Sequence, residues 1–532
     1  MDTLILAAGL ASRLSKYTHN IIPKYLINLD DNTGLYYLIS YWSKYSNRIY
    51  LVIHSKYNII TNFYIENILS DYSDKIKIIN YDHSDGTAFT LNYILNNNLK
   101  DENINHLLLT WCDLYPTQEI EFHKLKGKYN KNNNIFIFTH GSKCRYKLDE
   151  NNKILNSNDG NIVGIYYFHN YKNFILNNDC YNNDIVCYLE EIGNLYNFEI
   201  KNIIDYGDEE KILNILNNKK SKLFNCRFFN NISFIDDHKL FKKGINNKGL
   251  DIIKFEKNWY EYMNYLKSDQ LNELIPKIYN IFHNGFIIEY KKDYIPLYQY
   301  FINNQESTNI KDLILENIIK KINIIHKIEK INVSKTLFFY NLKKEIYDKV
   351  INRKNIIKDF INYFGNITVV NNLKIDSFDN ILNKCKNILV NYYEKNNLFE
   401  YSIILGDCQF SNILIDKQDI NNIVFIDPRG YFGDSIIHGP HDYDYAKILY
   451  GISGYDKFNY EYFNIQSIDN ESISFNIDTI NYDNKIINEY FTEVHKAYLV
   501  IIWLSLAEYN KNNIWKCLCA YYHGLYLGTL FT

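Results

Sequence analysis

The sequence predicts an α/β domain followed by an α+β domain, and three observations support this prediction. Over residues 1–217, short apolar runs alternate with helical patterns, which is typical of a mainly parallel sheet covered by helices. Over residues 223–300 the pattern changes to short strand-like runs with one helix. From about residue 308 onward, long amphipathic helical patterns dominate, as expected for a helical lobe.

The strands of the first domain are predicted from apolar runs that are short and bounded by polar or turn-forming residues. These runs lie at residues 3–8, 48–54, 75–80, 107–110 and 135–139. A polar stretch at 218–222 then predicts a linker. We therefore expect the first domain to span 1–217 and the second to span 223–532.

The second domain is expected to divide into a β-rich lobe over 223–300 and a helical lobe over 301–532. A helix is predicted near 252–266 and another over 309–328. Strand-like runs at 403–405, 413–415 and 423–426 interrupt the helical lobe and predict one embedded hairpin. A β-rich lobe followed by a helical lobe with such a hairpin is the two-lobe plan of kinases.

Composition excludes some classes of function. A formal net charge of −3 over 532 residues gives no reason to expect nucleic acid or an anionic membrane as partner. The nine cysteines include no C-x-x-C pair, so we expect reduced thiols in a cytoplasmic protein. The first lysine, Lys16, follows the first apolar run, which argues against a signal peptide. The expected partner is a small molecule, and a homo-oligomer is possible.

The first motif follows the first predicted strand. It reads Leu-Ala-Ala-Gly-Leu-Ala-Ser-Arg-Leu over 6–14, and Pro-Lys-Tyr-Leu follows at 23–26. Small residues, here Ala8, Gly9 and Ser12, let backbone N–H groups approach a phosphate closely. Arg13 and Lys24 can neutralise a triphosphate and the phosphate that attacks it. A turn of this kind alone is equally typical of a structural strand-to-helix connection.

Taken together, the loop 6–14 and the segment 23–26 resemble the sugar-phosphate nucleotidyltransferase family, which has a Rossmann-like α/β fold. Ala11 stands where that family usually has a second glycine. Four later segments resemble the family in order. Gly86 and Thr87 match its nucleotide-binding segment, Asp113 ends a strand in the second segment, 164–168 match its strand near the acceptor, and Asp205 lies in the closing segment 203–210. The resemblance implies that Asp113 and Asp205 are the two carboxylates that hold Mg²⁺. Each Asp taken singly is equally typical of a helix cap or turn.

The second motif lies in the helical lobe. Asp407 is followed five residues later by Asn412, and Asp427 ends the next strand-like run. In kinases such an Asp accepts the substrate hydroxyl proton, while the Asn and the second Asp hold Mg²⁺ on ATP. The spacing resembles the aminoglycoside phosphotransferase and choline kinase family. Leu405 replaces the usual histidine of that family, which removes a structural hydrogen bond.

The remaining parts of an ATP site are placed by their order before Asp407. We select Lys242 as the lysine that grips ATP, with Lys243 as the alternative, and Glu256 as its partner. Glu289 lies in the segment 287–290 expected to hold adenine. An exposed, solvated role is the competing interpretation for Lys242 and Glu256. Residues 441–447 resemble a family segment whose acids support the loop or face the substrate.

These resemblances together predict a bifunctional enzyme for surface-glycan synthesis. It would phosphorylate a sugar or polyol with ATP, then transfer a nucleotide from a second NTP (CTP, GTP or UTP), with Mg²⁺ at both sites. The first alternative is a choline or ethanolamine kinase fused to a phosphocholine-type cytidylyltransferase. In the second, one domain is a non-catalytic binding module, to which only Leu405 and Ala11 point.

Overall fold

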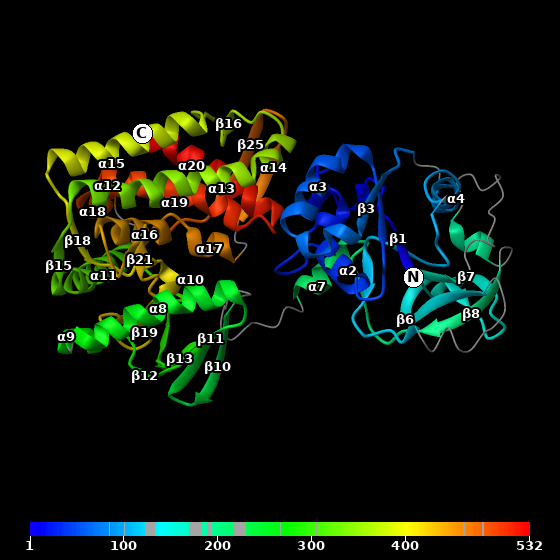
Figure 1. Ribbon diagram of the computed structural model, residues 1–532, viewed down its shortest axis with the longest axis horizontal. Coiled ribbons are helices and arrows are strands. Elements are labelled where there is room, and N and C mark those ends of the chain that lie inside the picture. The colour runs from blue at the N-terminus through cyan, green and yellow to red at the C-terminus, as the bar shows by residue number, and fades with distance from the viewer. Residues whose placement is uncertain are drawn as a thin grey trace. The chain divides into compact units, whose positions relative to one another are not determined.

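The computed structural model describes residues 1–83, 86–100, 102–122, 134–169, 184–189, 193–217, 230–266, 268–304, 306–460, 463–480 and 484–532. The chain forms two compact units (Figure 1). The first comprises Met1–Lys220 with the short segments Asp359–Phe364 and Asn512–Ile514. The second comprises Ser221–Lys358, Gly365–Lys511 and Trp515–Thr532. The predicted linker at 218–222 lies outside the described residues.

The first unit is built on a seven-stranded sheet with the order β3-β2-β1-β4-β7-β6-β8. Its strands are β3 (Ile76–Asn80), β2 (Ile49–Ile53), β1 (Asp2–Leu6), β4 (His106–Trp111), β7 (Ile154–His169), β6 (Asn134–Leu148) and β8 (Asn194–Glu199). β7 runs antiparallel to both of its neighbours, and the other pairings are parallel. The predicted α/β sheet is confirmed, but it is mixed, because a connection as short as 149–153 allows only an antiparallel hairpin.

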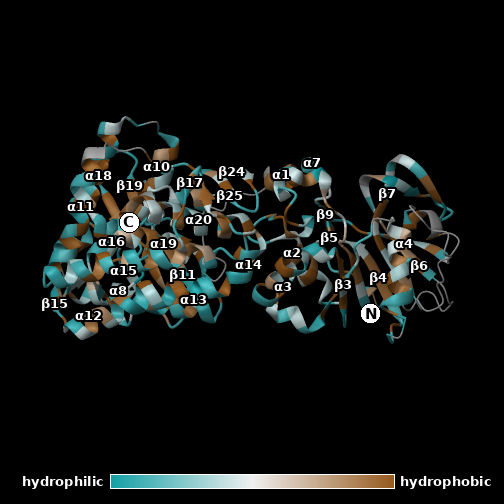
Figure 2. Cartoon of the chain, turned by 90° about the horizontal axis from the view of Figure 1, so that it is seen from above, coloured by the Kyte–Doolittle hydropathy of each residue, from teal (hydrophilic) through white to brown (hydrophobic). Residues whose placement is uncertain are grey.

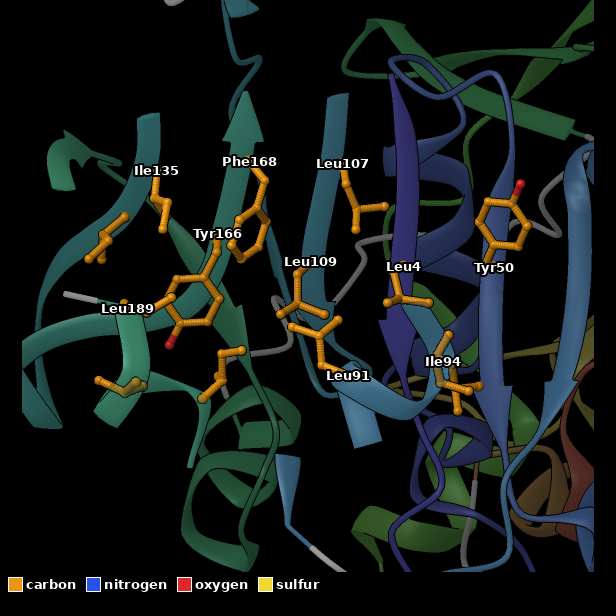
Figure 3. Packing of buried hydrophobic residues seen from close by; sticks show 14 of the residues in the cluster. Leu4, Tyr50, Leu91, Ile94, Leu107, Leu109, Ile135, Tyr166, Phe168 and Leu189 are labelled. Atoms are coloured by element: carbon orange, nitrogen blue, oxygen red, sulfur yellow. The ribbon is translucent and has the colours of Figure 1, made fainter. Parts of the chain in front are cut away.

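The central parallel strands β1, β2 and β4 are buried on both faces, which explains why they read as continuous apolar runs. The helices are α2 (Gly34–Trp42), α3 (Asn58–Asn67) and α4 (Thr87–Asn97). Leu91 and Ile94 of α4 pack in one cluster with Leu4 and Leu109 of the sheet (Figure 3). Figure 2 shows the corresponding hydrophobic residues along central strands such as β4.

The order of the strands marks a place where ligands bind in open α/β sheets. The chain moves from β1 through β2 to β3 on one side, and then returns to place β4 on the other side of β1. At such a switch point the connections leave in opposite directions, and a crevice opens beyond the carboxyl ends of the two strands. The loop after β1 and Asp113 after β4 both lie at this edge.

A second, two-stranded sheet lies next to this edge. β5 (Leu114–Pro116) pairs antiparallel with β9 (Ile203–Asp205), so that Leu114 lies opposite Asp205. Tyr206 continues the pairing by donating its N–H to the carbonyl of Asp113 at 2.9 Å. Helix α7 (Glu209–Asn217) follows. Residues about 90 positions apart in sequence are thereby brought side by side.

The β-rich part of the second unit is a four-stranded antiparallel sheet with the order β10-β11-β13-β12. The strands are β10 (Asn230–Asp236), β11 (Lys239–Gly244), β13 (Gly285–Glu289) and β12 (Ile278–Ile281). Helix α8 (Asn247–Leu266) packs against β11 and β13. This helix includes the one predicted near 252–266 and begins earlier.

The helical part surrounds α19 (Glu493–Tyr509), which is buried from Ala497 to Ala507 because this stretch is mainly apolar on all sides. It packs against α13 (Lys349–Ile356), α15 (Phe378–Lys395) and α16 (Asp442–Ile452). The other main elements are α11 (Thr308–Ile328), α12 (Lys335–Leu342), a π-helix (Lys343–Asp348), α17 (Tyr455–Asn459), α20 (Ile514–Phe531), β16 (Val369–Val370), β17 (Leu373–Lys374), β24 (Phe463–Ile468) and β25 (Ser472–Ile477).

The strand-like runs of the helical part divide between two small sheets. β19 (Ile413–Asp416) and β20 (Ile423–Phe425) form the expected hairpin, which β14 (Tyr294–Pro296) joins. The run predicted at 403–405 does not belong to this hairpin. It ends β18 (Glu400–Ile403), which pairs with β15 (Lys330–Asn332) and β23 (His438–Gly439), because the loop 404–412 leads the chain away before β19 begins.

Candidate active sites

The loop after β1 turns sharply at Ala11. This residue has φ 55° and ψ 33°, in the left-handed region, immediately before a 3₁₀ turn at Ser12–Leu14. Glycine adopts this conformation without steric cost, whereas alanine does not. The position is therefore one where a glycine is expected on backbone grounds alone, and alanine adopts the left-handed conformation here.

The predicted phosphate-binding residues of this loop face solvent. Gly9, Ser12 and Arg13 are exposed, and Ala8 is half-buried. A Cβ placed on Gly9 would meet no atom within 4 Å, so its backbone is open on that side. Arg13 has no ion-pair partner among the described residues. The loop is therefore accessible to an anionic ligand.

Two carboxylates meet beside this loop. A Cβ placed on Gly207 would lie 3.0 Å from Asp113 Oδ2 and 3.3 Å from Asp205 Oδ1, so the two side chains flank the same point. Asp113 Oδ1 is buried and has no hydrogen-bond partner among the described residues. An orphaned carboxylate oxygen beside a second carboxylate suits Mg²⁺, which usually takes one or two carboxylates and completes its shell with water and phosphate oxygens.

Lys24 binds the first of these carboxylates and acts electrostatically with the second. Its Nζ is 2.6 Å from Asp113 Oδ2. Burial acts to lower the pKa of Lys24, but the neighbouring Cys112, Asp113 and Asp205 outweigh burial and raise its pKa above the ordinary value. The lysine therefore stays charged, and the structure brings together three of the predicted residues: Lys24, Asp113 and Asp205.

Lys211 of α7 was not predicted. Its Nζ lies 2.7 Å from Asp205 Oδ2 and 3.4 Å from Asp208 Oδ2. Burial acts to lower the pKa of Lys211, and its bonds to Asp205 and Asp208 raise it overall. The spacing of Asp208 and Lys211 by three residues, just after Asp205, was the available signal, because such positions share one helix face.

Gly86 and Thr87 begin α4. Gly86 has φ 86°, which favours glycine, and precedes the first turn of the helix. The Thr87 hydroxyl accepts a hydrogen bond from Ile185 N at 3.0 Å and donates one to Asp184 Oδ1 at 3.3 Å. Thr87 therefore joins two segments of the unit through its side chain. Asp85 lies outside the described residues.

Lys242 connects the two parts of the second unit. Its Nζ lies 2.9 Å from Glu256 Oε1 on α8 and 2.8 Å from Asp427 Oδ1 after β20. Burial acts to lower the pKa of Lys242, while Asp427 and Glu256 raise it overall. Burial also raises the pKa of Glu256, to about 8. Lys243 is half-exposed, and strand alternation directs its side chain to the other face of β11.

Asp407 and Asn412 face each other across the loop between β18 and β19. Asn412 Nδ2 donates to the Asp407 carbonyl at 2.8 Å, and it lies 3.4 Å from Asp407 Oδ2. Ile426 N donates to the Asn412 carbonyl at 3.0 Å, which joins this loop to Asp427. Asp427 has φ 54°, a strained backbone of the kind that often marks functional positions. Asn412 and Asp427 offer oxygen ligands of the type that Mg²⁺ takes.

Asp444 of α16 fixes the backbone of the same loop through hydrogen bonds. Its carboxylate is fully buried and accepts hydrogen bonds from Leu405 N at 2.9 Å and Gly406 N at 2.6 Å. His326 Nε2 of α11 lies 3.0 Å from Asp444 Oδ2. The loop is thus fixed although Leu405 is an apolar, buried residue. Asp444 belongs to the segment 441–447 singled out in the sequence, whereas nothing in the sequence pointed to His326.

A buried ion pair supports the segment after Asp427. Arg429 donates two hydrogen bonds of 2.7 Å to the carboxylate of Glu345, which lies in the π-helix. Burial acts to lower the pKa of Arg429, and Glu345 raises it overall. A bidentate pair of this kind fixes orientation as well as charge. No sequence pattern indicates this pair, because the two residues are 84 positions apart.

Glu289 ends β13, the strand predicted to hold adenine. Its N–H donates to the Lys277 carbonyl at 2.8 Å, and the N–H of Tyr290 donates to the His238 carbonyl at 2.7 Å. The Glu289 side chain binds Lys291 at 2.9 Å and accepts from Lys277 N at 3.1 Å. The N–H groups of Glu289 and Tyr290 are therefore used within the protein, and a base bound here would need other hydrogen-bond donors.

No protein-family model matches the chain, and neither does any curated protein sequence. A Bacillus anthracis protein assigned as a glucose-1-phosphate thymidylyltransferase, solved with a sucrose, is similar in structure at 15% identity. The match covers 42% of this chain and 98% of that one, with a TM-score of 0.35.

Two further solved structures are similar to the same extent. HddC from Yersinia pseudotuberculosis, complexed with GMP-PN, is 21% identical over 41% of this chain and 99% of its own, with a TM-score of 0.34. The inositol-1-phosphate CTP transferase from T. maritima is 12% identical over 42% and 98%, with a TM-score of 0.32. At these identities and TM-scores, the similarity assigns no function to this chain. Within its described part, no helix has the length and apolar character to cross a bilayer.

Proposed function

We propose that the chain is a bifunctional transferase. The second unit transfers the γ-phosphate of ATP to a hydroxyl of a small molecule. The first unit then joins the resulting phosphate to a nucleoside monophosphate taken from an NTP. The observation that carries the proposal is that each unit gathers a charged lysine and two Mg²⁺-type ligands from distant parts of the sequence.

In the first unit both reactants are anions, so charge neutralisation is the main requirement. A phosphate monoester attacks the α-phosphorus of the NTP, and pyrophosphate leaves. Lys24, already held at the carboxylate pair, and the exposed Arg13 supply positive charge beside the loop 7–14. When bound by Asp113 and Asp205, Mg²⁺ would offset negative charge on the phosphates. The open backbone at Gly9 offers N–H groups to the phosphates.

In the second unit the attacking group is a hydroxyl, which has to lose its proton. Asp407 is the acceptor of that proton, because it lies on the loop beside the two proposed ligands, Asn412 and Asp427. Lys242 would bind ATP phosphates while Glu256 keeps its side chain extended into the site. Mg²⁺ held by Asn412 and Asp427 would neutralise charge on the phosphates.

The two activities form a sequence because the product of the kinase is a phosphate monoester, which is the nucleophile of the nucleotidyl transfer. The proposed acceptor is a sugar or polyol, and the product is its nucleotide-activated form. The second NTP is CTP, GTP or UTP. The competing acceptor, an amino alcohol such as choline, leads to a cytidine diphosphate product and is distinguished in the same experiment.

The test is to incubate the full chain with ATP, Mg²⁺, one further NTP and a panel of sugars, polyols and amino alcohols. Products are identified by mass spectrometry. We expect a nucleotide-linked acceptor only when ATP, the second NTP and the matching acceptor are all present. When the phosphorylated acceptor is supplied with the second NTP, the same nucleotide-linked product should form without ATP and without the free acceptor. The panel is tested both as free acceptors and as acceptor phosphates. If ADP alone, or pyrophosphate alone, forms with every compound tested, the bifunctional assignment is wrong.

A further inference from the structure

Lys447 forms an ion pair with the carboxylate of Asp407. Lys447 Nζ is 2.9 Å from Asp407 Oδ1, and the lysine side chain is only 11% exposed. Lys447 Nζ also lies 5.8 Å from the centre of the Tyr443 ring and 5.2 Å from that of the Tyr450 ring. An ion pair enclosed in this way is screened less by water than a surface pair, so it has a defined geometry.

The helix that carries Lys447 also holds the backbone of the loop. Asp444 and Lys447 are three residues apart on α16, so they lie on the same helix face. Asp444 binds Leu405 N and Gly406 N, while Lys447 binds the side chain of the next residue, Asp407. One helix therefore fixes both the path of the loop and the direction of its acidic side chain.

The loop itself supplies no cation. Residues 407–412 read Asp-Cys-Gln-Phe-Ser-Asn, without lysine or arginine. A further acidic group lies near it: Asp456 of α17 accepts a hydrogen bond from Ser411 N at 3.0 Å, and Asp407 acts electrostatically on Asp456. ATP would add further negative charge. A fixed cation next to Asp407 offsets this charge and keeps the carboxylate from turning toward other donors.

We infer that Lys447 is a positioning residue for phosphoryl transfer: from α16 it orients the carboxylate of Asp407 toward the acceptor hydroxyl. This inference rests on the proposed kinase function of the second unit. Displacing a reacting group by about 1 Å costs on the order of 10²-fold in rate. The loss should appear in kcat and not in KM for ATP, because Lys242, Glu256 and Asp427, and not Lys447, form the proposed ATP site.

The test compares Lys447→Met, Lys447→Arg and Lys384→Met with the unchanged chain. Lys384 is the matched control, since its Nζ also lies 2.9 Å from a carboxylate, that of Asp376, but on α15. The assay measures ADP release from ATP and Mg²⁺, with and without the acceptor panel. Pyrophosphate release by the first unit, assayed with the acceptor phosphates, and thermal unfolding report whether each variant folds.

We expect Lys447→Met to lower kcat for ADP release about 10²-fold with KM for ATP changed less than about threefold. Lys447→Arg should recover part of the loss, and Lys384→Met should behave as the unchanged chain. If Lys447→Met does not fold, Lys447→Gln takes its place under the same criteria. An unchanged kcat, a loss confined to KM, or an arginine variant no better than methionine would each overturn the inference.

Failure of the proposed function has a different signature. In that case the unchanged chain releases no ADP, or Asp407→Asn releases it at the full rate. If Asp407→Asn is inactive while Lys447→Met keeps the full kcat, the kinase assignment stands and only the role of Lys447 is wrong.

Discussion

Replacing Asp444 by asparagine should loosen the loop that carries Asp407. The carboxylate of Asp444 accepts from Leu405 N through Oδ2 and from Gly406 N through Oδ1. Asparagine has a single acceptor oxygen, so whichever way the amide turns, one of these buried N–H groups faces an NH₂ donor. His326, which shares Oδ2, can adapt by changing its tautomer, but a backbone N–H cannot.

The size of the effect follows from these contacts. An unsatisfied buried N–H costs about 1–3 kcal/mol, and the remaining bonds lose the strength that the charge gives them. We therefore expect local opening of the loop to become easier by about 3 kcal/mol, which is on the order of 10²-fold faster amide hydrogen exchange at Leu405 and Gly406. Release of ADP should fall with it, while pyrophosphate release by the first unit should be unchanged.

Asp434→Asn is the matched control, because Asp434 is half-exposed and pairs with Lys344 at the surface. It should change exchange at the loop by less than about 0.5 kcal/mol, as surface substitutions usually do. Hydrogen exchange measured by mass spectrometry is suited to the question, since a chain of two units does not unfold in one step. Equal protection of the loop in Asp444→Asn and in the unchanged chain would refute the role given to Asp444.

Three further predictions concern other parts of the chain. Ala11→Gly should keep pyrophosphate release, whereas Ala11→Val should reduce it and lower the unfolding midpoint, because a β-branched residue fits φ 55° poorly. Equal behaviour of the two variants would contradict this account of the turn. Gly207→Ala should slow pyrophosphate release on the order of 10²-fold without affecting ADP release, since the added methyl group would lie 3.0 Å from Asp113 Oδ2; a normal rate would show that the carboxylates do not meet there during catalysis. Burial lowers the pKa of His523 from 6.5 to about 3, so only the unfolded chain binds its proton near pH 6, and the stability of the second unit is full above pH 6.5 and falls below it. Between pH 7.5 and 5.5 the loss should be about 1.4 kcal/mol larger in the unchanged chain than in His523→Leu, measured from the separate urea transition of the second unit, and parallel pH profiles would disprove it.

The sequence predicts most strands of the first unit and the fold class, because buried parallel strands are continuous apolar runs. It also predicts Asp113 and Asp205 as a pair, although their meeting depends on β5 and β9, which were not predicted. The short strands contain three residues each, too few for any periodicity. Lys211 is not predicted from the sequence, because a lysine on a polar helix face is usually solvated.

The supports of the second site are harder to find in a sequence. Asp444 and His326 meet only after α11 and α16 have packed, 118 positions apart. Arg429 and Glu345 are likewise joined by tertiary folding, and an isolated Arg or Glu has no pattern that reveals its partner. Motif spacing therefore indicates the groups proposed to touch substrates, whereas the residues that orient them depend on packing between distant helices.

The most direct test of the central claim measures two products in the same samples. ADP release and pyrophosphate release are assayed for the unchanged chain, Asp113→Asn and Asp407→Asn, with the acceptor and its phosphate supplied separately. The account predicts that Asp113→Asn loses pyrophosphate release and keeps ADP release, and that Asp407→Asn does the reverse. The assignment of one reaction to each unit would be wrong if either substitution abolished both products in a folded protein, or if either left both products unchanged.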